Sequence, residues 1–412
     1  MLLNFVYNYD TLYFFCQPLY YTRMNFDNYF DWAATAPADK DILTEALKIA
    51  IDFGGNPSSV HAEGIKAKKI LTEARKICAT SLNTKPETIY FTSGGTESDY
   101  LPMLSLLQGP VRGNILISSI EHAAISAQAH MMKNCGFTVT EIPSNKEGII
   151  TPDAVISKMQ EDTQLICIMA VNNETGAIQP IYEIADAITK YSKGKRRPRF
   201  HVDAVQAIGK IPFNVSYNGI DSASLSAHKL GGPRGVGILY LAQRIEPFLR
   251  AGGQENGIRS GTENLSGIWA LSKILEKYIT QEKNNFNQTY AKQINRTALF
   301  IENLKTIKGC SIIPNSRGIN PTSSNYSPWI LQASFANIPG QVMVRALSEK
   351  GYYISTGSAC SNHKKNRPVL AAMGINGDLA TNTVRISFGK NSTDKGLEGL
   401  FLAIKEVADL FN

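Results

Sequence analysis

Short apolar runs alternate with longer amphipathic segments over much of this chain. The runs are rich in β-branched residues and include 115–117, 165–168 and 237–240. The helix-length segments that separate such runs include 44–53, 62–82 and 181–191. From about residue 42 to about residue 275, this alternation predicts a mainly parallel α/β sheet with helices on both faces. Ligands of such sheets bind at the carboxyl ends of the strands, so a functional site is expected at that edge.

The pattern changes near residue 278. A polar, helix-like stretch at 278–303 is followed by shorter strands and helices, which predict a smaller α+β domain. The expected organisation is therefore a large domain at 39–282 and a small domain at 283–412, with the segment 24–38 packing on the small domain.

The residues that precede this pattern, 1–23, are rich in Tyr and Phe. They carry no Lys or Arg before Arg23, so they lack the basic region of a secretory signal and the Arg-rich face of a transit peptide. Met24 is an alternative start. An extension of unknown role and a start-site artefact are equally open, and no function is assigned to these residues.

Composition narrows the classes of protein. A chain of 412 residues is too long for one ordinary core, and 43% hydrophobic residues are typical of a soluble globular protein. No uninterrupted apolar stretch of about 18 residues occurs, so no membrane span is predicted. The net charge is +7, and the densest basic cluster lies at 193–199. Because this cluster lacks the interleaved aromatic residues of a nucleic-acid site, we expect a solvated connector and no direct nucleic-acid binding.

The cysteines lie far apart, without a Cys-x-x-Cys pair. They are Cys16, Cys78, Cys135, Cys167, Cys310 and Cys360. This spacing favours neither a zinc site nor a small disulfide scaffold. The expected compartment is a reducing cytoplasm.

Two charged residues stand at predicted strand ends. Lys229 follows an apolar strand and precedes a Gly-rich turn, where a desolvated amine can form a Schiff base with an aldehyde cofactor. Asp203 ends the apolar run that starts at Phe200, and its carboxylate suits the protonated ring nitrogen of pyridoxal phosphate (PLP). Taken alone, Lys229 is more often a solvated loop lysine, and Asp203 is as often a helix N-cap. Together the two residues indicate a PLP enzyme.

A third feature supports this pair. The run 89–92 has the pattern of a strand, and Ser93-Gly-Gly-Thr-Glu-Ser98 then leads into an apolar stretch that continues to Leu107. A strand, a Gly-rich turn and a helix in this order direct backbone N–H groups and the helix dipole at an anion, with the Ser93 and Thr96 hydroxyls as further donors. The turn therefore predicts a phosphate site, although a plain turn with Ser/Thr capping has the same local pattern.

These segments resemble the cysteine desulfurases, a branch of the PLP-dependent class V aminotransferases. The resemblance extends from about Tyr29 to the C-terminus. The motifs that carry it occur in the order of the family: Asp31-Trp-Ala-Ala-Thr-Ala-Pro37, Gly55-Asn-Pro-Ser-Ser59, Ser93-Gly-Gly-Thr-Glu-Ser98, Glu121-His122, Val171-Asn-Asn-Glu-Thr-Gly176, His201-Val-Asp-Ala-Val-Gln206, Ser226-Ala-His-Lys229, Arg259-Ser-Gly-Thr262, Ser358-Ala-Cys360 and Thr383-Val-Arg385. Each motif alone is weakly specific, but the ordered set is very specific. The resemblance implies PLP-dependent transferase fold type I, with L-cysteine as the substrate.

The resemblance also implies catalytic roles. Lys229 would hold PLP and move the Cα proton, Asp203 would keep the ring nitrogen protonated, and His122 would lie over the ring and transfer protons. Gln206 would donate to the phenolate oxygen. On spacing alone, His122 is more often a helix cap or a core histidine, and Gln206 is as often a surface amide.

The phosphate and the dimer follow from the same resemblance. Thr96, Ser226 and His228 would hold the phosphate, and Gly95 would allow close backbone approach. Thr262 would reach the phosphate of the partner subunit, which implies a homodimer, although an ordinary helix N-cap has the same local pattern.

Substrate and reaction depend on three further residues. Arg385 would bind the α-carboxylate bidentately, assisted by Asn173, which also belongs to the cofactor site; an ordinary surface Arg is the alternative. Cys360 lies in a polar, Gly/Ser-rich loop, followed by the cations His363, Lys364, Lys365 and Arg367, which favour a thiolate. The alternative, a buried and inert thiol, does not suit this polar loop. A mobile thiolate there would accept the sulfur of the substrate as a persulfide, and alanine would be the other product.

The predicted function is a homodimeric, PLP-dependent cysteine desulfurase that supplies persulfide sulfur for iron–sulfur clusters, with thiolated RNA or cofactors left open as further destinations. Its partners would be L-cysteine and a sulfur acceptor or iron–sulfur scaffold protein. The basic run after Cys360 differs from the family pattern and leaves the acceptor open. Three alternatives are retained: a selenocysteine lyase, another class V PLP enzyme that does not use Cys360, and a catalytically silent adaptor.

Overall fold

A seven-stranded sheet, here called the large sheet, forms the centre of the computed structural model, which describes residues 26–281, 283–357 and 367–411. Its strands, in spatial order, are β1 (Ile89–Thr92), β7 (Gly237–Leu241), β6 (Ser222–Ser226), β5 (Arg199–Asp203), β4 (Thr163–Met169), β2 (Asn114–Ser118) and β3 (Thr138–Ile142). Neighbouring strands from β6 to β3 pair in parallel, as the alternation predicted. The predicted mainly parallel sheet is confirmed.

Strand β7 is the exception, because it pairs antiparallel with both β6 and β1. The connection from β6 to β7 covers only residues 227–236 and contains the short 3-10 helix η5 (Ala227–Lys229). A parallel return needs a crossover of a dozen or more residues, so the chain turns straight back. Apolar periodicity does not encode strand direction, and the alternation therefore could not predict this reversal.

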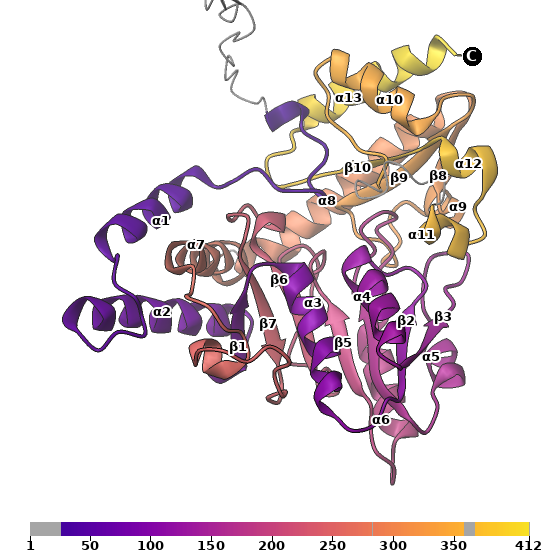
Figure 1. The fold of residues 1–412 in the computed structure, drawn as a ribbon. Coiled ribbons are helices and arrows are strands. Elements are labelled where there is room, and N and C mark those ends of the chain that lie inside the picture. Colours follow the sequence, from indigo (N-terminus) through magenta and orange to yellow (C-terminus); the bar gives the residue numbers. More distant parts are fainter. Residues whose placement is uncertain (1–25, 282, 358–366, 412) are drawn as a thin grey trace, which may run out of the picture.

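Helices cover both faces of the large sheet. They include α3 (Gly95–Leu104), α4 (Ala123–Asn134), α5 (Pro152–Lys158), α6 (Ile181–Tyr191) and α7 (Leu265–Leu275). The first two helices, α1 (Lys40–Asp52) and α2 (Ala62–Ser81), pack mainly on α7. In β2, Ile115 and Ile117 pack with the core under α3 and α4, whereas Leu116 packs into the main core with α6. Figure 1 shows α3 and α4 on the near face of the sheet. Successive strand residues point to opposite faces, so a sheet buried on both sides needs continuous apolar runs.

A second, three-stranded antiparallel sheet, here called the small sheet, lies above the large one in Figure 1. It contains β8 (Cys310–Ile313), β9 (Ile330–Phe335) and β10 (Thr383–Ser387). Its helices are α8 (Lys283–Lys305), α9 (Asn315–Ile319), α10 (Gly340–Glu349), α11 (Pro368–Ala372), α12 (Gly377–Thr381) and α13 (Asp394–Asp409). The remaining short elements are the 3-10 helices η2 (Phe26–Asn28), η3 (Pro86–Thr88), η4 (Ser105–Gln108) and η6 (Gln254–Gly257), and the π-helical η7 (Glu276–Gln281).

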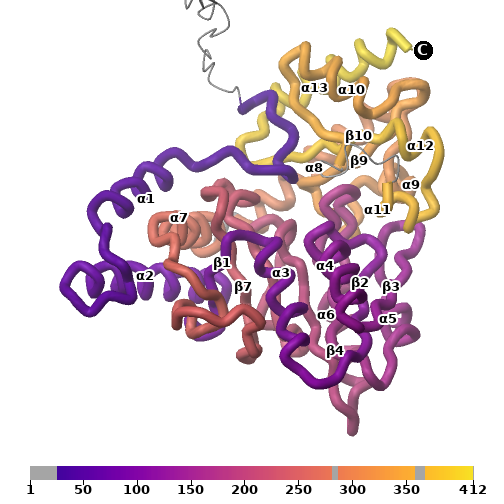
Figure 2. Tube along the Cα trace, in the orientation of Figure 1, coloured from indigo at the N-terminus to yellow at the C-terminus, as the bar shows by residue number. Residues whose placement is uncertain are grey.

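The first described segment connects the two sheets. Tyr29 and Asp31 form isolated bridges with Tyr353 and Ser387 beside the small sheet. The chain then continues into α1, as the indigo trace in Figure 2 shows. The residues between Asp31 and α1 therefore lie where the small sheet meets the large one.

The carboxyl ends of β1, β4, β5 and β6 lie at one edge of the large sheet, since these strands run in the same direction. Thr96, Asn173, Asp203 and Lys229 stand at or just after these ends, where the sequence predicted them. Among the described residues, no helix is long and apolar enough to cross a membrane.

Candidate active site

A glycine turn begins α3 at this edge of the large sheet. Gly94 has φ 152°, and a Cβ on Gly95 would lie 2.7 Å from Cγ2 of Val205. The buried Ser226 lies on the other side of Gly95, with its Cβ 3.7 Å from that position. A larger residue would therefore collide with the wall of the turn, and the backbone N–H groups at the start of α3 stay accessible to a small anion.

One side chain of the same turn, Glu97, already has hydrogen-bond partners. The carboxylate of Glu97 accepts hydrogen bonds from the backbone N–H of Ser93 and, at 3.1 Å, from Nε of Arg259. Thr96 is exposed on the first turn of α3. The pattern of a strand, a turn and a helix is thus confirmed, and Glu97 takes one of the donors that the sequence left for an anion.

Lys229 is half-buried rather than solvated, which makes the loop-lysine alternative wrong. It ends η5, and its Nζ donates to the backbone oxygens of Ala33 and Ala34, both at 2.8 Å. These carbonyls belong to the segment between the two sheets. The amine is therefore fixed at the strand edge by residues almost two hundred positions earlier in the sequence.

Asp203 is 6% exposed at the end of β5. Its Oδ1 accepts hydrogen bonds from the N–H of Val205 at 3.0 Å and from Oγ of Ser224 at 3.4 Å. Burial first, and then the neighbouring Asp99, raises the pKa of Asp203 to about 6. Within the described residues, Oδ2 accepts no hydrogen bond and no ion pair reaches this carboxylate. A cationic ligand group beside Oδ2 would stabilise the ionised form.

Two histidines at the edge are neutral. His122 caps α4, since its Nδ1 accepts the N–H of Ala124 at 3.1 Å. Burial lowers the pKa of His122, and the nearby Lys229 and Arg385 lower it further, while Asp203 raises it. His122 is therefore a helix cap through Nδ1, while its Nε2 is available for other contacts.

The second histidine, His228, lies within 3.2 Å of Oγ1 of Thr35 through its Nδ1. Burial and the neighbouring Lys229 lower the pKa of His228 to about 4. A neutral imidazole can donate one hydrogen bond and accept another, but it brings no charge to an anion.

Gln206 is 4% exposed, so the surface-amide alternative is wrong. Its Nε2 donates to the backbone oxygen of Ala33 at 2.9 Å, and its Oε1 accepts from Nζ of Lys210 at 2.6 Å. Burial, followed by the charges of Lys229 and Arg385, lowers the pKa of Lys210 to about 7. Sequence reasoning missed Lys210. Its position four residues after Gln206, among apolar neighbours, was the available signal.

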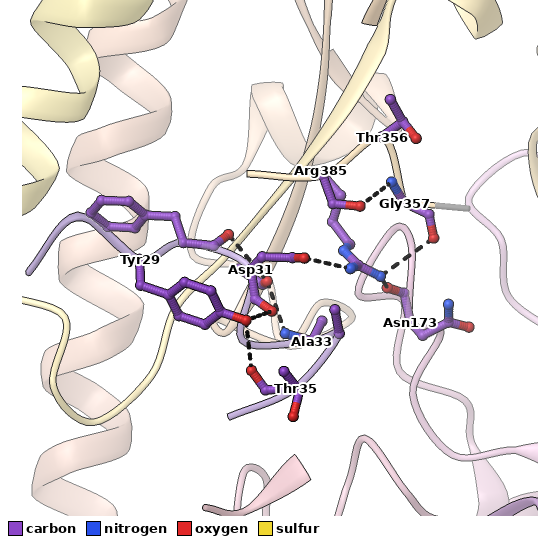
Figure 3. Close-up of polar contacts among 12 residues, drawn as sticks. Tyr29, Asp31, Ala33, Thr35, Asn173, Thr356, Gly357 and Arg385 are labelled. Atoms are coloured by element: carbon purple, nitrogen blue, oxygen red, sulfur yellow. Dashed lines mark hydrogen bonds and ion pairs between the residues drawn. The ribbon is translucent and has the colours of Figure 1, made fainter. Parts of the chain in front are cut away.

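Arg385 reaches the same site from β10 of the small sheet. It is 2% exposed, so the surface-Arg alternative is wrong. Figure 3 shows its guanidinium between Asp31 on one side and Asn173 and Gly357 on the other. Nη2 donates to Oδ1 of Asp31 at 2.7 Å, and Nη1 donates to the backbone oxygens of Asn173 at 2.9 Å and Gly357 at 3.4 Å. The buried Nε has no partner among the described residues.

Two further residues named from the sequence are not brought to this edge by any described contact. Thr262 is exposed, and the N-cap of α7 is Asn264, whose side chain accepts the N–H of Gly267 at 3.1 Å. The N-cap alternative for Thr262 is therefore wrong. Cys360 lies outside the described residues, together with His363, Lys364 and Lys365.

The other cation assigned to the Cys360 loop, Arg367, is engaged in an ion pair. Its Nη2 donates to Oε2 of the buried Glu174 at 3.1 Å and to the backbone oxygen of Thr356 at 2.7 Å. Three of the described cysteines differ from the expected reactive thiol. Burial raises the pKa of Cys78, Cys167 and Cys310, the last to about 12.

These residues fit PLP. The glycine turn admits a phosphate, the half-buried amine of Lys229 suits the aldehyde, and the free oxygen of Asp203 suits a protonated ring nitrogen. Within the described residues there is no cluster of His, Cys, Asp and Glu that could hold a metal ion.

Comparison with known proteins agrees with this geometry. Residues 28–400 match the aminotransferase class V family. The chain is 36% identical to the "NifS/IcsS protein homolog" of Lactobacillus delbrueckii subsp. bulgaricus, over 93% of this chain and 98% of the relative. It is 36% identical to "Cysteine desulfurase IscS" of Methanosarcina thermophila, over 92% of this chain and 91% of the relative. A solved "NifS-like protein" superposes with a TM-score of 0.83 at 33% identity, covering 93% of this chain and 99% of that one.

Proposed function

The chain belongs to the class V aminotransferases, in the group of the NifS/IscS cysteine desulfurases, and on this premise we propose that it converts L-cysteine to L-alanine and transfers the sulfur to Cys360. One observation carries the proposal. His122 lies within electrostatic reach of Asp203, Lys229 and Arg385 at once. A ring-nitrogen partner, an amine and a carboxylate receptor thus surround one neutral histidine, which is the set of groups that a PLP enzyme acting on an amino acid needs.

The cofactor would be held at the edge of the large sheet. Gly95, Thr96, Ser226 and His228 would hold the phosphate, and Asp203 would pair with the ring nitrogen. Asn173 and Gln206 would contact the ring, with Thr262 of the partner subunit completing the phosphate site. When bound, PLP supplies a sink for the electrons left on Cα of the substrate.

Side chains of the protein would bind the substrate, transfer protons and accept the sulfur. Arg385 would bind the substrate carboxylate, helped by Asn173, after rearranging its hydrogen bond to Asp31. The neutral His122 can accept a proton at Nε2, and Lys229 would move the proton at Cα. The Cys360 thiolate would attack the substrate sulfur as the Cβ–S bond breaks. The electron pair of that bond stays with the substrate, which takes up a proton and leaves as alanine, and the sulfur stays on Cys360 as a persulfide until an acceptor removes it.

A homodimer is the proposed assembly. Helices α1 and α2 extend away from the large sheet (Figure 1), and apolar side chains near them are exposed: Leu47 by 62%, Ile51 by 72% and Val60 by 93%. Leu47 and Ile51 are four positions apart on α1 and so lie on one face of that helix, which suits an interaction surface. The sulfur acceptor would be an iron–sulfur scaffold protein or another carrier, in the cytoplasm, without direct nucleic-acid contact. We also propose domain limits at 39–282 and 283–412.

The function is tested by alanine and sulfide release from L-cysteine, with persulfide on Cys360 read by mass spectrometry. Cys360→Ala should reduce sulfur transfer by about 10²-fold or more, because the accepting thiolate is lost. Cys135→Ala is the matched control, since Cys135 is half-buried beside Met131 and should leave transfer unchanged.

Two results would favour other functions. Undiminished transfer by Cys360→Ala would indicate a selenocysteine lyase or another class V enzyme that does not use this thiol. A purified protein without PLP absorbance would indicate a silent adaptor.

A further inference from the structure

A row of buried polar side chains lies behind Asp203, on the face of the large sheet that α3 covers. The parallel register of β5 and β6 places His201 opposite Ser222 and Asp203 opposite Ser224. His201 and Asp203 are two residues apart in one strand, so their side chains point to the same face. Asp99, on the first half of α3, completes the row from above the sheet.

Hydrogen bonds join these side chains into one chain. Nδ1 of His201 lies 2.8 Å from Oγ of Ser222, and Nε2 of His201 lies 3.2 Å from Oδ1 of Asp99. Ser224 lies beside both carboxyl groups, because its hydroxyl lies 3.4 Å from Oδ1 of Asp203, to which it can donate, and is close enough to Asp99 to lower the pKa of that group. Every member is buried, with His201 at 0% and Asp99 at 2% exposure. Because these side chains are buried from bulk solvent, a donor or acceptor left unpaired would be costly, and the positions of the protons in the network are constrained.

Two carboxyl groups in one dry network cannot both be ionised without a large penalty. Burial raises the pKa of Asp99 to about 7, and burial lowers the pKa of His201 to about 4. The neutral His201 accepts one hydrogen bond and donates one, so with Ser222 on Nδ1 it can donate from Nε2 to Asp99. Behind Asp203, whose own pKa is about 6, Asp99 is thus the member of the network that changes charge near neutral pH.

Other titratable groups face this network from the neighbouring elements. Glu121, just before α4, accepts from Ser118 and from the N–H of Met169, and burial raises its pKa well above the usual range. His122 is neutral. Burial also raises the pKa of Cys167, which stands opposite His201 on β4. Burial disfavours the charged form of each of these three groups, so Asp99, which touches His201 directly, is the carboxyl group behind Asp203 that we take to set the local charge.

We propose that Asp99 and His201 are positioning residues that hold negative charge behind Asp203 and thereby keep the ring nitrogen of the cofactor protonated. The proposal rests on the proposed function, because Asp203 faces a ring nitrogen only in a PLP enzyme. A negative charge next to a proton shared by Asp203 and a ring nitrogen favours keeping that proton. Ser224 lies between the two carboxyl groups, and its single hydroxyl proton can be donated to only one of them at a time, which couples Asp99 to Asp203.

The first test needs no cofactor. In the cofactor-free protein, the ring ¹⁵N signals of His201, assigned by their loss in His201→Gln, should shift as Asp99 titrates near neutral pH. Asp99→Asn should abolish that shift, because the neutral amide has no charge to change. A His201 signal that follows pH equally in the Asp99→Asn protein would overturn the inference, whether or not the protein proves to be a PLP enzyme.

The second test uses the protein loaded with ¹⁵N-labelled PLP. The ring nitrogen of the wild-type protein should stay protonated to a pH about one unit higher than that of Asp99→Asn or His201→Gln. Ser224→Ala removes only a small hydroxyl and should give part of the same shift, which keeps the proposal testable if Asp99→Asn does not fold. Thr297→Val is the control, since Thr297 is equally buried in a network that ends at Pro328.

The outcomes distinguish a failure of the positioning role from a failure of the proposed function. Identical ring-nitrogen titrations in the wild-type, Asp99→Asn and Ser224→Ala proteins would overturn the positioning role. A protein that binds no PLP would contradict the proposed function, and the cofactor-free test would still decide whether Asp99 and His201 share a proton.

Discussion

Arg385 and Asp203 are both buried charges at the candidate site, but their surroundings differ. Arg385, on the small sheet, has a carboxylate at 2.7 Å and two backbone carbonyls. Asp203, on the large sheet, has no ion pair within the described part of the chain, and burial raises its pKa to about 6. An unpaired buried charge is unfavourable, whereas a paired one is stabilised. Arg385 therefore already has an anionic partner, although its buried Nε has none among the described residues, whereas Asp203 depends on a cationic group of a ligand.

The largest expected effect comes from replacing the guanidinium while keeping its charge. Arg385→Lys should lower kcat/KM for L-cysteine by about 10³-fold, equivalent to about 4 kcal/mol, because an ammonium cannot bind a carboxylate with two parallel hydrogen bonds. Cofactor content, read from PLP absorbance, should be unchanged. Arg296→Lys is the control, because Arg296 pairs with the exposed Asp394 and none of its described contacts reaches the candidate site. A loss of cofactor equal to the loss of activity would assign Arg385 to the cofactor site instead.

The next effect concerns stability and tests whether the carboxylate of Asp31 stabilises the buried guanidinium of Arg385. Asp31→Asn should lower the free energy of unfolding by about 3 kcal/mol, since it leaves a guanidinium buried without its carboxylate. Denaturant unfolding of the cofactor-free protein measures this change. Asp394→Asn is matched in chemistry, but the Asp394 side chain is 77% exposed, so its ion pair should contribute less than about 1 kcal/mol. Equal losses for the two variants would show that burial does not distinguish these ion pairs.

The smallest expected effect is a gain in stability, which comes from removing the unpaired carboxylate of Asp203. Because the pKa of Asp203 is raised from 3.8 to about 6, ionisation opposes folding, and this cost grows as the pH rises between those values. Asp203→Asn should therefore stabilise the cofactor-free protein by about 2 kcal/mol near neutral pH and have no effect below about pH 4. Denaturant unfolding at several pH values checks this. A loss of stability at neutral pH would mean that the carboxylate already has a stabilising partner.

The sequence alone predicted most of the large sheet and the kinds of residue at its edge. Apolar runs separated by amphipathic helices specify strands buried on both faces, and parallel strands bring their carboxyl ends together. Lys229 and Asp203 could be found because each follows directly on a buried strand, and the glycine turn could be found because its residues are adjacent in the chain. These signals are local, so they can be recognised in the sequence without knowledge of the fold.

Tertiary structure decided which partner each of these groups has. Asp31 and Arg385 are 354 positions apart, and the carbonyls of Ala33 and Ala34 reach Lys229 from a distant segment. Asp99 and His201 meet only because α3 packs over β5 and β6. The direction of β7 was likewise set by the length of one connection. Such contacts depend on strand register and on packing between remote segments. Register and packing leave no periodic or local pattern in the sequence, so the partner of a charged residue could not be predicted from it.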